Sequence, residues 1–230
     1  MKVYRTAGLT AVWRYMAKID LYSIKYVNLP IKIIACILGL LDPNSVKTIT
    51  QRTKLIDSFI AKLKPKNIVE IGAGFSSRAK RFKNIKCYEL DLPYFKKKKS
   101  NLIPFEIGKD SLNLDIKYAL FIVEGVTMYL QKEQVIRLLK QIKQYKGHII
   151  IDFFNKEKFI EEKRINEKIY KALFKLVINR NYLFDYRIEN VQDGASLLKS
   201  LGYRNVHYYN YDIPKTLDVL MTTLHALVRE

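Results

Sequence analysis

The chain has 230 residues, 49% of them hydrophobic, which is enough to bury the core of one domain. It carries 41 Lys and Arg against 22 Asp and Glu, and the formal net charge of +19 would attract anionic partners without identifying them. The two cysteines, Cys36 and Cys87, form no C-x-x-C pair. We therefore expect neither a disulfide framework nor a metal site.

The amino-terminal region contains one long apolar stretch. Residues 29–41 are apolar apart from Lys32, but about thirteen residues are too few to cross a bilayer, which takes roughly twenty. We interpret the stretch as a buried helix within an amino-terminal helical cover spanning residues 1–60. A shallow membrane-binding helix is the alternative, favoured by the basic surroundings. The first residues lack the sustained apolar run of a secretory signal, so we expect a cytoplasmic protein.

A glycine-rich turn is the most informative feature of the chain. Residues 68–71 have the apolar character of a buried parallel strand, and residues 77–82 are typical of the helix that follows it. Between them, Gly72 and Gly74 permit a tight turn and the close approach of a ligand to bare backbone. The pattern predicts an α/β protein with a doubly wound sheet and a ligand at this turn, although an ordinary glycine turn would have the same sequence.

The residues around the turn narrow the choice of ligand. A dinucleotide-binding fingerprint has a third glycine where this chain has Ser77. Glu70, just ahead of the glycines, would repel a pyrophosphate but attract a cation. S-adenosylmethionine carries such a cation and no phosphate, so the turn favours it over a dinucleotide.

Two further carboxylates end predicted strands. Asp91 ends the strand 87–91, where a ribose would present its hydroxyls, although it could also cap the next helix. Glu124 follows the apolar strand 118–123 directly. Burying such a carboxylate is costly unless a ligand or a cation satisfies it, so Glu124 points to a binding site.

The remaining pattern continues the alternation of strands and helices. Apolar spacing and turn residues predict a strand at 104–107, a helix at 131–146, a strand at 148–154, a long lid-like helix at 156–178, a helix at 191–201 and a strand at 205–211. Residues 218–229 fit either a strand or a helix.

Several of these segments resemble one enzyme family. EIGAGFSSRAKRF, YELDLP and VEGVTMYL resemble three consecutive motifs of the leucine carboxyl methyltransferase family, including its TcmP-like polyketide O-methyltransferase branch. Thr6 to Arg14 resembles the T-A-x-x-x-A-x-x-R signature of that branch, and residues 51–57 resemble its arginine-bearing helix. The similarity covers residues 6–155.

This resemblance implies a fold and a cofactor. The fold would be a doubly wound, mostly parallel, seven-stranded Rossmann-like methyltransferase sheet under the helical cover of residues 1–60. Residues 61–230 would form the domain that binds S-adenosylmethionine, with a helical lid near 156–186.

The resemblance also implies roles for single residues. Arg52 would approach the carboxylate of the cofactor's methionine moiety, Asp91 the ribose, and Glu124 would close the pocket. The other cofactor-binding candidates are Glu70, Gly72, Gly74, Arg78 and, at the adenine ring, Asp110 and Ser111. Arg78 stands at the arginine of the family's D-T-R motif, but Ser76 replaces the aspartate, which leaves the partner of Arg78 open. Arg52 could instead be an ordinary solvated helix residue.

The implied reaction transfers a methyl group to an oxygen, and we expect the acceptor to be a carboxylate of a small molecule or a peptide terminus. A carboxylate is already ionised at neutral pH, so positioning and desolvation would suffice without a general base. Candidate groups to hold the acceptor are Tyr129, Arg187 and His207, with Tyr186. A hydroxyl acceptor would need a base, for which His207 or His225 would be the first candidates.

Two rival functions remain. Nucleic-acid methylation is disfavoured because neither a DPPY-like turn nor a prolyl-cysteine nucleophile follows the strand 118–123. The basic run Lys96 to Lys99 does not change this conclusion, because it is more simply explained as a solvated helix face than as a phosphate-binding site. A catalytically inactive methyltransferase-fold module, acting in binding or at a membrane surface, is the alternative to an enzyme, and we expect membrane contact to be minor.

Overall fold

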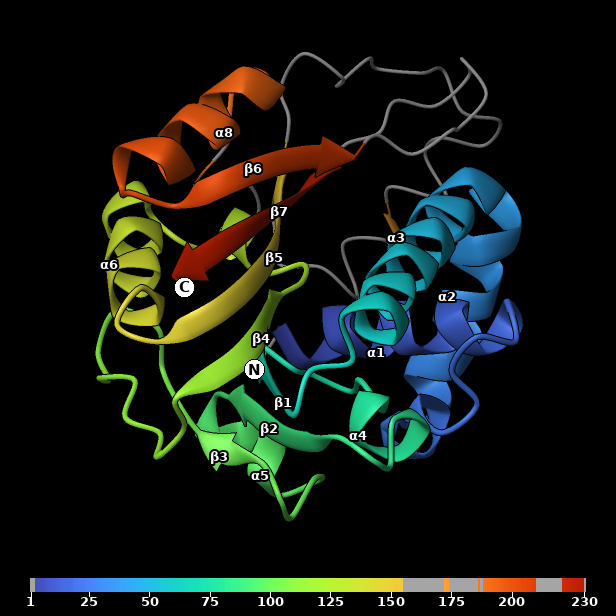
Figure 1. Ribbon diagram of the computed structural model, residues 1–230. Helices are drawn as coiled ribbons and strands as arrows, with labels where there is room; N and C mark the ends of the chain where they lie inside the picture. The colour runs from blue at the N-terminus through green and yellow to red at the C-terminus, as the bar shows by residue number, and fades with distance from the viewer. Residues whose placement is uncertain (1–2, 155–171, 174–185, 187, 210–220, 230) are drawn as a thin grey trace.

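The computed structural model describes residues 3–154, 172–173, 186, 188–209 and 221–229. Its centre is a seven-stranded sheet in the order β3-β2-β1-β4-β5-β7-β6 (Figure 1). The strands are β1 Asn67–Ile71, β2 Lys86–Asp91, β3 Ile103–Pro104, β4 Tyr118–Val123, β5 Lys146–Phe154, β6 Arg204–Tyr209 and β7 Met221–Arg229. Strands β1 to β5 pair in parallel, and β7 pairs antiparallel with β5 and β6. The predicted α/β sheet, mostly parallel and flanked by helices, is confirmed.

Helices cover both faces of the sheet, with α1, α2 and α3 on one side and α6 and α8 on the other (Figure 1). The helical segments are α1 Val3–Met16, η1 Ser23–Tyr26, α2 Leu29–Leu41, α3 Pro43–Leu63, α4 Arg78–Arg81, α5 Pro93–Lys96, η2 Thr127–Tyr129, α6 Lys132–Ile142 and α8 Val191–Ser200. The boundary expected near residue 60 falls inside α3.

The strands are apolar on both faces because each face packs on helices. In β4, Phe121 and Val123 belong to the core beneath α6 and α8, whereas Leu120 and Ile122 belong to the core beneath α3. A third apolar cluster lies between α1 and α2 and includes Phe75 from the glycine turn. The helices of the amino-terminal region thus share their cores with the sheet.

The chain reverses its direction of winding between β1 and β4. It proceeds outward from β1 through β2 to β3, and then returns to the other side of β1 with β4, where Ile71 lies opposite Val123. The segments that follow β1 and β4 therefore leave the sheet side by side. Ligands bind at such a switch point in open α/β sheets.

Most predicted elements agree with the structure, and three are shorter. The predicted helix 131–146 is α6, which ends at Ile142. The predicted strand 104–107 is only Ile103–Pro104, because the chain turns away after Phe105 donates its N–H to the Asp91 carbonyl at 2.8 Å. The predicted helix 77–82 is reduced to Arg78–Arg81. Residues 221–229, left open between strand and helix, form β7. The expected lid helix lies almost entirely outside the described residues.

The interpretation of residues 29–41 as a buried helix is wrong for one face. The helix forms as α2, and Ile31, Ala35 and Leu38 are buried, but Leu29 and Leu40 are 68% and 76% exposed. Among the described residues, the buried contacts of α2 lie on the side of Ile31, Ala35 and Leu38, so apolar composition alone overestimated its burial. In the part of the chain that the structure describes, no single helix is long and apolar enough to span a membrane.

Asp20 fastens the amino-terminal region to the sheet. Its fully buried carboxylate accepts hydrogen bonds from the Ser77 N–H at 3.2 Å and from the Ser77 hydroxyl, at the start of α4. It also accepts the Ser23 N–H at 3.1 Å. Burial alone would raise the pKa of Asp20, but Arg14 and the Ser77 hydrogen bond lower it overall. The ionised carboxylate therefore joins the cover to the turn after β1.

We expect Asp20→Ala to lower the free energy of unfolding by about 3 kcal/mol, because several charge-assisted hydrogen bonds are lost in a buried place. Urea unfolding at neutral pH measures the change. The lowered pKa means that Asp20 stabilises the fold above its unfolded pKa and ceases to do so as pH falls through the folded pKa, so the difference should shrink in acid. Asp115→Ala, at an exposed loop position, is the control, and an equal loss there would contradict the role of Asp20.

Candidate functional site

A cavity of about 490 Å³ lies at the carboxyl ends of β1, β2 and β4, with α1 forming part of its wall. The cavity occupies the switch point of the sheet. The sequence-predicted site residues that line it are Arg52, Glu70, Gly72, Gly74, Asp91, Glu124 and Tyr129. Residues distant in the sequence are therefore brought together at one place.

The glycine turn forms the wall of the cavity between β1 and α4. Gly72 and Gly74 have φ values of +72° and +50°, in the left-handed region that favours glycine. A Cβ atom on Gly72 would lie 2.2 Å from Cγ2 of Val126, so a side chain there would displace the loop after β4. The Gly72 N–H donates to the Leu90 carbonyl at 2.8 Å, which holds the turn against β2. The turn thus presents bare backbone to the cavity.

Asp91 is held at the cavity by two backbone groups. One carboxylate oxygen accepts the Gly74 N–H at 2.6 Å, and the other accepts the Leu92 N–H at 2.7 Å. Burial raises the pKa of Asp91 to about 6, although these two hydrogen bonds act to lower it. The carboxylate does not cap α5, whose N-cap is Leu92. Each oxygen retains a lone pair that can accept a hydroxyl donor from the cavity.

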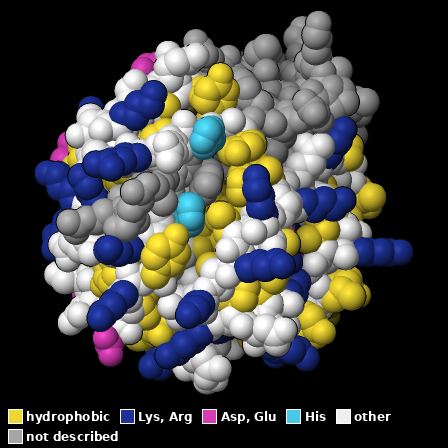
Figure 2. All heavy atoms as spheres, viewed as in Figure 1, with side chains coloured by type: hydrophobic (Ala, Val, Ile, Leu, Met, Phe, Trp, Pro, Cys, Tyr) yellow, Lys and Arg dark blue, Asp and Glu magenta, His cyan; other side chains and the backbone are white. Residues whose placement is uncertain are grey.

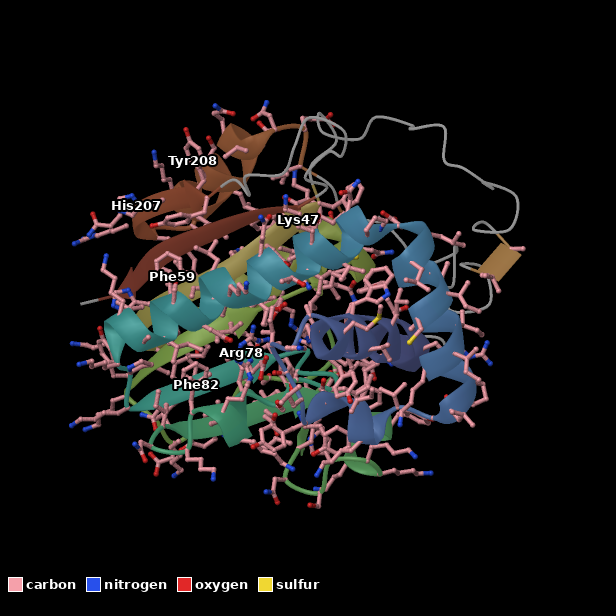
Figure 3. All side chains as sticks on the ribbon, turned by 90° about the vertical axis from the view of Figure 1, so that its right-hand side faces the viewer. Lys47, Phe59, Arg78, Phe82, His207 and Tyr208 are labelled. Carbon is pink, nitrogen blue, oxygen red and sulfur yellow. The ribbon has the colours of Figure 1, made fainter. Side chains whose placement is uncertain are left out.

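A network of buried ion pairs lies behind the cavity, with Arg78 at its centre. The Arg78 guanidinium, fully buried between α3 and the sheet, binds Glu70, binds Glu124 at 2.5 Å and reaches Asp57 at 3.2 Å (Figure 3). Arg52 Nε donates to the other Glu124 oxygen at 2.9 Å.

Asp152 extends this network to β5. Its carboxylate pairs with Arg52 at 3.1 Å and accepts the Gly125 N–H at 2.8 Å. Residues from α3, α4, β1, β5 and the segment after β4 are thereby tied together.

The network keeps Glu124 ionised. Burial would raise the pKa of Glu124, but Arg78 and Arg52 more than offset burial and lower that pKa well below its usual value. Although burial opposes them, Glu124 and Glu70 likewise hold the pKa of Arg78 well above its usual value. Glu124 was expected to need a ligand or a cationic partner, and its partners are these two arginines.

The structure corrects the expectations for both arginines. Arg52 is buried, so the solvated-helix interpretation is wrong, but its guanidinium is engaged by Glu124 and Asp152. Arg78 is not among the residues that line the cavity. Because Ser76 replaces the aspartate of the family motif, the partner of Arg78 was left open. Its partners are the carboxylates of Asp57, Glu70 and Glu124, so Arg78 acts as a positioning residue for Glu70 and Glu124.

The reasoning from sequence missed Arg14. This residue of α1 lines the cavity and is only 5% exposed, yet its Nε has no hydrogen-bond partner among the described residues. Burial lowers the pKa of Arg14, and Glu124 and Asp20 oppose that effect. The signal was present, since Arg14 closes the T-A-x-x-x-A-x-x-R run. A buried cation aimed into a cavity is suited to bind an anionic group.

Tyr129 also lines the cavity. Burial raises its pKa to about 12, although a hydrogen bond with the Thr6 side chain opposes the increase. The phenol therefore stays protonated at neutral pH and serves as a hydrogen-bond donor rather than a base. Among the described lining residues there is no histidine, lysine or cysteine.

Several expected site residues lie elsewhere. His207 is exposed on β6, at the antiparallel edge of the sheet (Figure 3). Tyr186 packs on Phe153, with ring centroids 6.0 Å apart, and Arg187 lies outside the described residues.

The two expected adenine contacts, Asp110 and Ser111, are exposed and do not line the cavity. The Asp110 carboxylate accepts the Glu106 N–H at 2.6 Å, which turns this loop so that Glu106 and Ile107 line the cavity instead. The expectation for Asp110 and Ser111 is therefore not supported by their positions.

The lysine run after β2 is not uniformly solvated. Lys96, Lys97 and Lys98 are exposed, but Lys99 is buried and donates to Glu89 at 2.5 Å and to the Ser76 carbonyl at 2.8 Å. Through Ser76, Lys99 thereby helps to hold the segment that follows the glycine turn. No group of three or more potential metal ligands occurs within the described ranges.

We expect Arg78→Met to lower the free energy of unfolding by about 3–5 kcal/mol, because three carboxylates would lose their shared buried cation. Urea unfolding measures the loss, and Arg204→Met, at an exposed position on β6, is the matched control. A variant as stable as the parent would show that the network does not hold the fold together.

Comparisons with known proteins identify the fold. No protein-family model matches the chain, and no curated protein matches its sequence. Solved structures do match. A proposed methyltransferase from Thermobifida fusca YX aligns with a TM-score of 0.57 and 11% identity, covering 96% of this chain and 94% of that protein. The chain has the fold of S-adenosylmethionine-dependent methyltransferases.

Two further structures support this conclusion. An S-adenosylmethionine-dependent methyltransferase from Archaeoglobus fulgidus aligns with a TM-score of 0.51 and 13% identity, covering 76% of this chain and 93% of that protein. A proposed O-methyltransferase from Nostoc punctiforme PCC 73102 aligns with a TM-score of 0.50 and 14% identity over 83% of this chain. The chain spans only 59% of the length of the Nostoc protein.

Proposed function

We propose that this chain is an S-adenosylmethionine-dependent O-methyltransferase whose acceptor is a carboxylate of a small molecule or a peptide terminus. One observation carries the proposal: a cavity at the switch point of a methyltransferase fold combines a glycine turn, the Asp91 carboxylate and the buried Arg14 cation. The motifs shared with the leucine carboxyl methyltransferase family support the same conclusion.

The residues of the cavity fit the chemistry of this cofactor. Asp91 has lone pairs for the two ribose hydroxyls, and Leu92, Phe105 and Ile107 offer an apolar wall to a purine. Glu70 and Glu124 supply negative charge for the ammonium and sulfonium groups. When bound, S-adenosylmethionine supplies an electrophilic methyl group on its sulfonium.

Arg14 replaces Arg52 as the residue that would bind the carboxylate of the cofactor's methionine moiety. The Arg52 guanidinium already binds Glu124 and Asp152, whereas Arg14 Nε has no described partner. A carboxylate bound by Arg14 would satisfy that buried cation. The cavity would then match the amino-acid end of the cofactor charge for charge, with an arginine for the carboxylate and glutamates for the ammonium.

The lining also favours a carboxylate as acceptor. Transfer to a hydroxyl needs a base to remove its proton, the described lining contains no histidine, lysine or cysteine, and its glutamates are paired, Glu70 and Glu124 with Arg78 and Glu106 with Lys109. The Tyr129 phenol is protonated, and Asp91 is held by two N–H groups. A carboxylate arrives ionised and needs only placement and a water-excluded site. Tyr129 is available as a donor to it, whereas the Thr10 hydroxyl already donates to the Ala7 carbonyl at 3.0 Å and Thr6 is hydrogen-bonded to Tyr129.

Transfer of a labelled methyl group from S-adenosylmethionine to members of a carboxylic-acid library tests the proposal. We expect label that mild base releases as methanol, because esters hydrolyse where ethers and methylamines do not. Asp91→Asn should bind the cofactor product S-adenosylhomocysteine at least about tenfold more weakly, since an amide is a poorer acceptor for the ribose hydroxyls. Base-stable label would exclude a carboxylate acceptor, and a parent protein that does not bind S-adenosylhomocysteine would exclude the cofactor.

The role of Arg14 has its own test by calorimetric titration. Arg14→Gln should weaken binding of S-adenosylhomocysteine by about 10–100-fold, as expected for a charge-assisted hydrogen bond to a carboxylate. Binding of 5′-methylthioadenosine, which lacks the amino-acid moiety, should change by less than about twofold, because it has no carboxylate to lose. Arg204→Gln, at an exposed position on β6 away from the cavity, is the control. Equal weakening of both ligands would show that Arg14 only supports the cavity wall.

A further inference from the structure

One face of α2 is apolar and exposed. Leu29, Ile33, Ile37 and Leu40 are 68%, 53%, 39% and 76% exposed and follow one another at the spacing of a single helix face. We name these four residues the apolar stripe. The opposite face, with Ile31, Ala35 and Leu38, packs on Leu9, Val12 and Trp13 of α1. Aliphatic side chains gathered on the surface of one helix mark an interaction site.

Close packing of α2 on α1 keeps the apolar stripe facing away from α1. A Cβ on Gly8 of α1 would lie 2.9 Å from Ile31, and one on Gly39 of α2 would lie 2.9 Å from the Trp13 indole, so the helices touch where side chains are absent. The Trp13 indole N–H also donates to the Ala35 carbonyl at 2.8 Å. Rotation of α2 to bury the stripe would break these contacts.

More apolar surface lies at the end of α1 and in the turn that follows. Tyr15, Met16, Leu21 and Tyr22 are each more than a third exposed. They belong to the segment that leads from α1 through η1 to α2. The amino-terminal region thus presents apolar side chains from several consecutive elements.

The part of the sequence that contains the stripe is basic and has almost no acidic residues. From residue 1 to residue 41 the sequence has a single acidic residue, Asp20, and its carboxylate is fully buried. Lys18 and Lys25 are exposed, and Lys32 is half-buried on α2 itself. In Figure 2 the visible acidic side chains lie in the left-hand half, whereas yellow and dark blue side chains alternate on the right, where α2 lies.

We propose that this face of α2 docks onto the surface of a bilayer that contains anionic lipids. The apolar stripe would enter the boundary between headgroups and acyl chains, and Lys18, Lys25 and Lys32 would meet the lipid phosphates, which is the combination that binds interfacial helices. The proposal is independent of the proposed function.

Other occupants fit the face less well. A nucleic acid offers phosphates but no counterpart for four aliphatic side chains. A second copy of the chain would bring lysines against lysines, with no exposed carboxylate in residues 1–41 to pair with them. An anionic bilayer complements both the apolar and the basic parts.

Docking leaves the cavity in place. Helix α1 lies between the cavity and α2. Its residues Thr6, Thr10 and Arg14 line the cavity, whereas Leu9, Val12 and Trp13 pack on α2. Substitutions in the stripe should therefore change membrane binding and leave the fold intact.

Sedimentation of the full chain with vesicles tests the proposal. We expect binding to vesicles of phosphatidylcholine mixed with phosphatidylglycerol, and much weaker binding to phosphatidylcholine alone. Leu29→Ser/Leu40→Ser should weaken binding to the mixed vesicles at least about tenfold, because two large aliphatic side chains no longer leave water. Lys25→Glu/Lys32→Glu should weaken it by a similar factor of about tenfold.

Matched controls come from exposed residues elsewhere. Ile103→Ser/Tyr118→Ser removes apolar surface from strands, and Lys132→Glu/Lys140→Glu reverses charges on α6. Both should bind as the parent does, and thermal unfolding should be unchanged in all four variants.

Three results would overturn the proposal. The parent could fail to bind the mixed vesicles. Binding could fall with the lysine substitutions but not with the leucine substitutions, which would indicate charge attraction without insertion. The parent could be a dimer that Leu29→Ser/Leu40→Ser dissociates, as size-exclusion chromatography would show, in which case a second copy covers the face.

Discussion

The buried pairing of Arg78 with Glu70 and Glu124 is the interaction on which the rest of the site depends. Three charged groups taken out of water are tolerated only because each satisfies another, and Arg52 and Asp152 extend the same pairing to β5. The pairing joins α4 to β1 and to the segment after β4, which are the elements that border the cavity. The geometry of this pairing therefore determines the positions of the Glu70 and Glu124 carboxylates in the cavity wall.

This pairing also decides which arginine is available to a ligand. Glu124 engages both Arg52 and Arg78, so the arginine expected from the family motif to bind the ligand carboxylate is occupied. Arg14 reaches the cavity from α1 and remains without a described partner at Nε. The positive and negative ends of the site are thus supplied by different parts of the fold: the amino-terminal cover and the sheet.

Much of the sheet could be predicted from sequence because parallel strands buried on both faces are continuous apolar runs. Tyr118–Val123 is such a run, and its bounds agree with β4. The glycine turn could also be predicted, because two glycines one residue apart directly after an apolar strand are typical of a tight turn. The pairing of the Arg52 guanidinium with Glu124 could not be predicted, because the two residues are 72 positions apart in the sequence. For residues 29–41 the sequence favoured a buried helix over a surface helix, because composition does not reveal which side of a helix has neighbours.

The attachment of α1 to the rest of the molecule has a consequence for folding. Asp20 contacts Ser77 across 57 residues of chain, and Arg14 lines a cavity that Glu124 also lines. Contacts so distant along the chain form late and slowly, because long loops must close first. During synthesis at the ribosome, the first helices emerge long before the strands that complete their surroundings, so this chain must delay its final architecture until translation is well advanced.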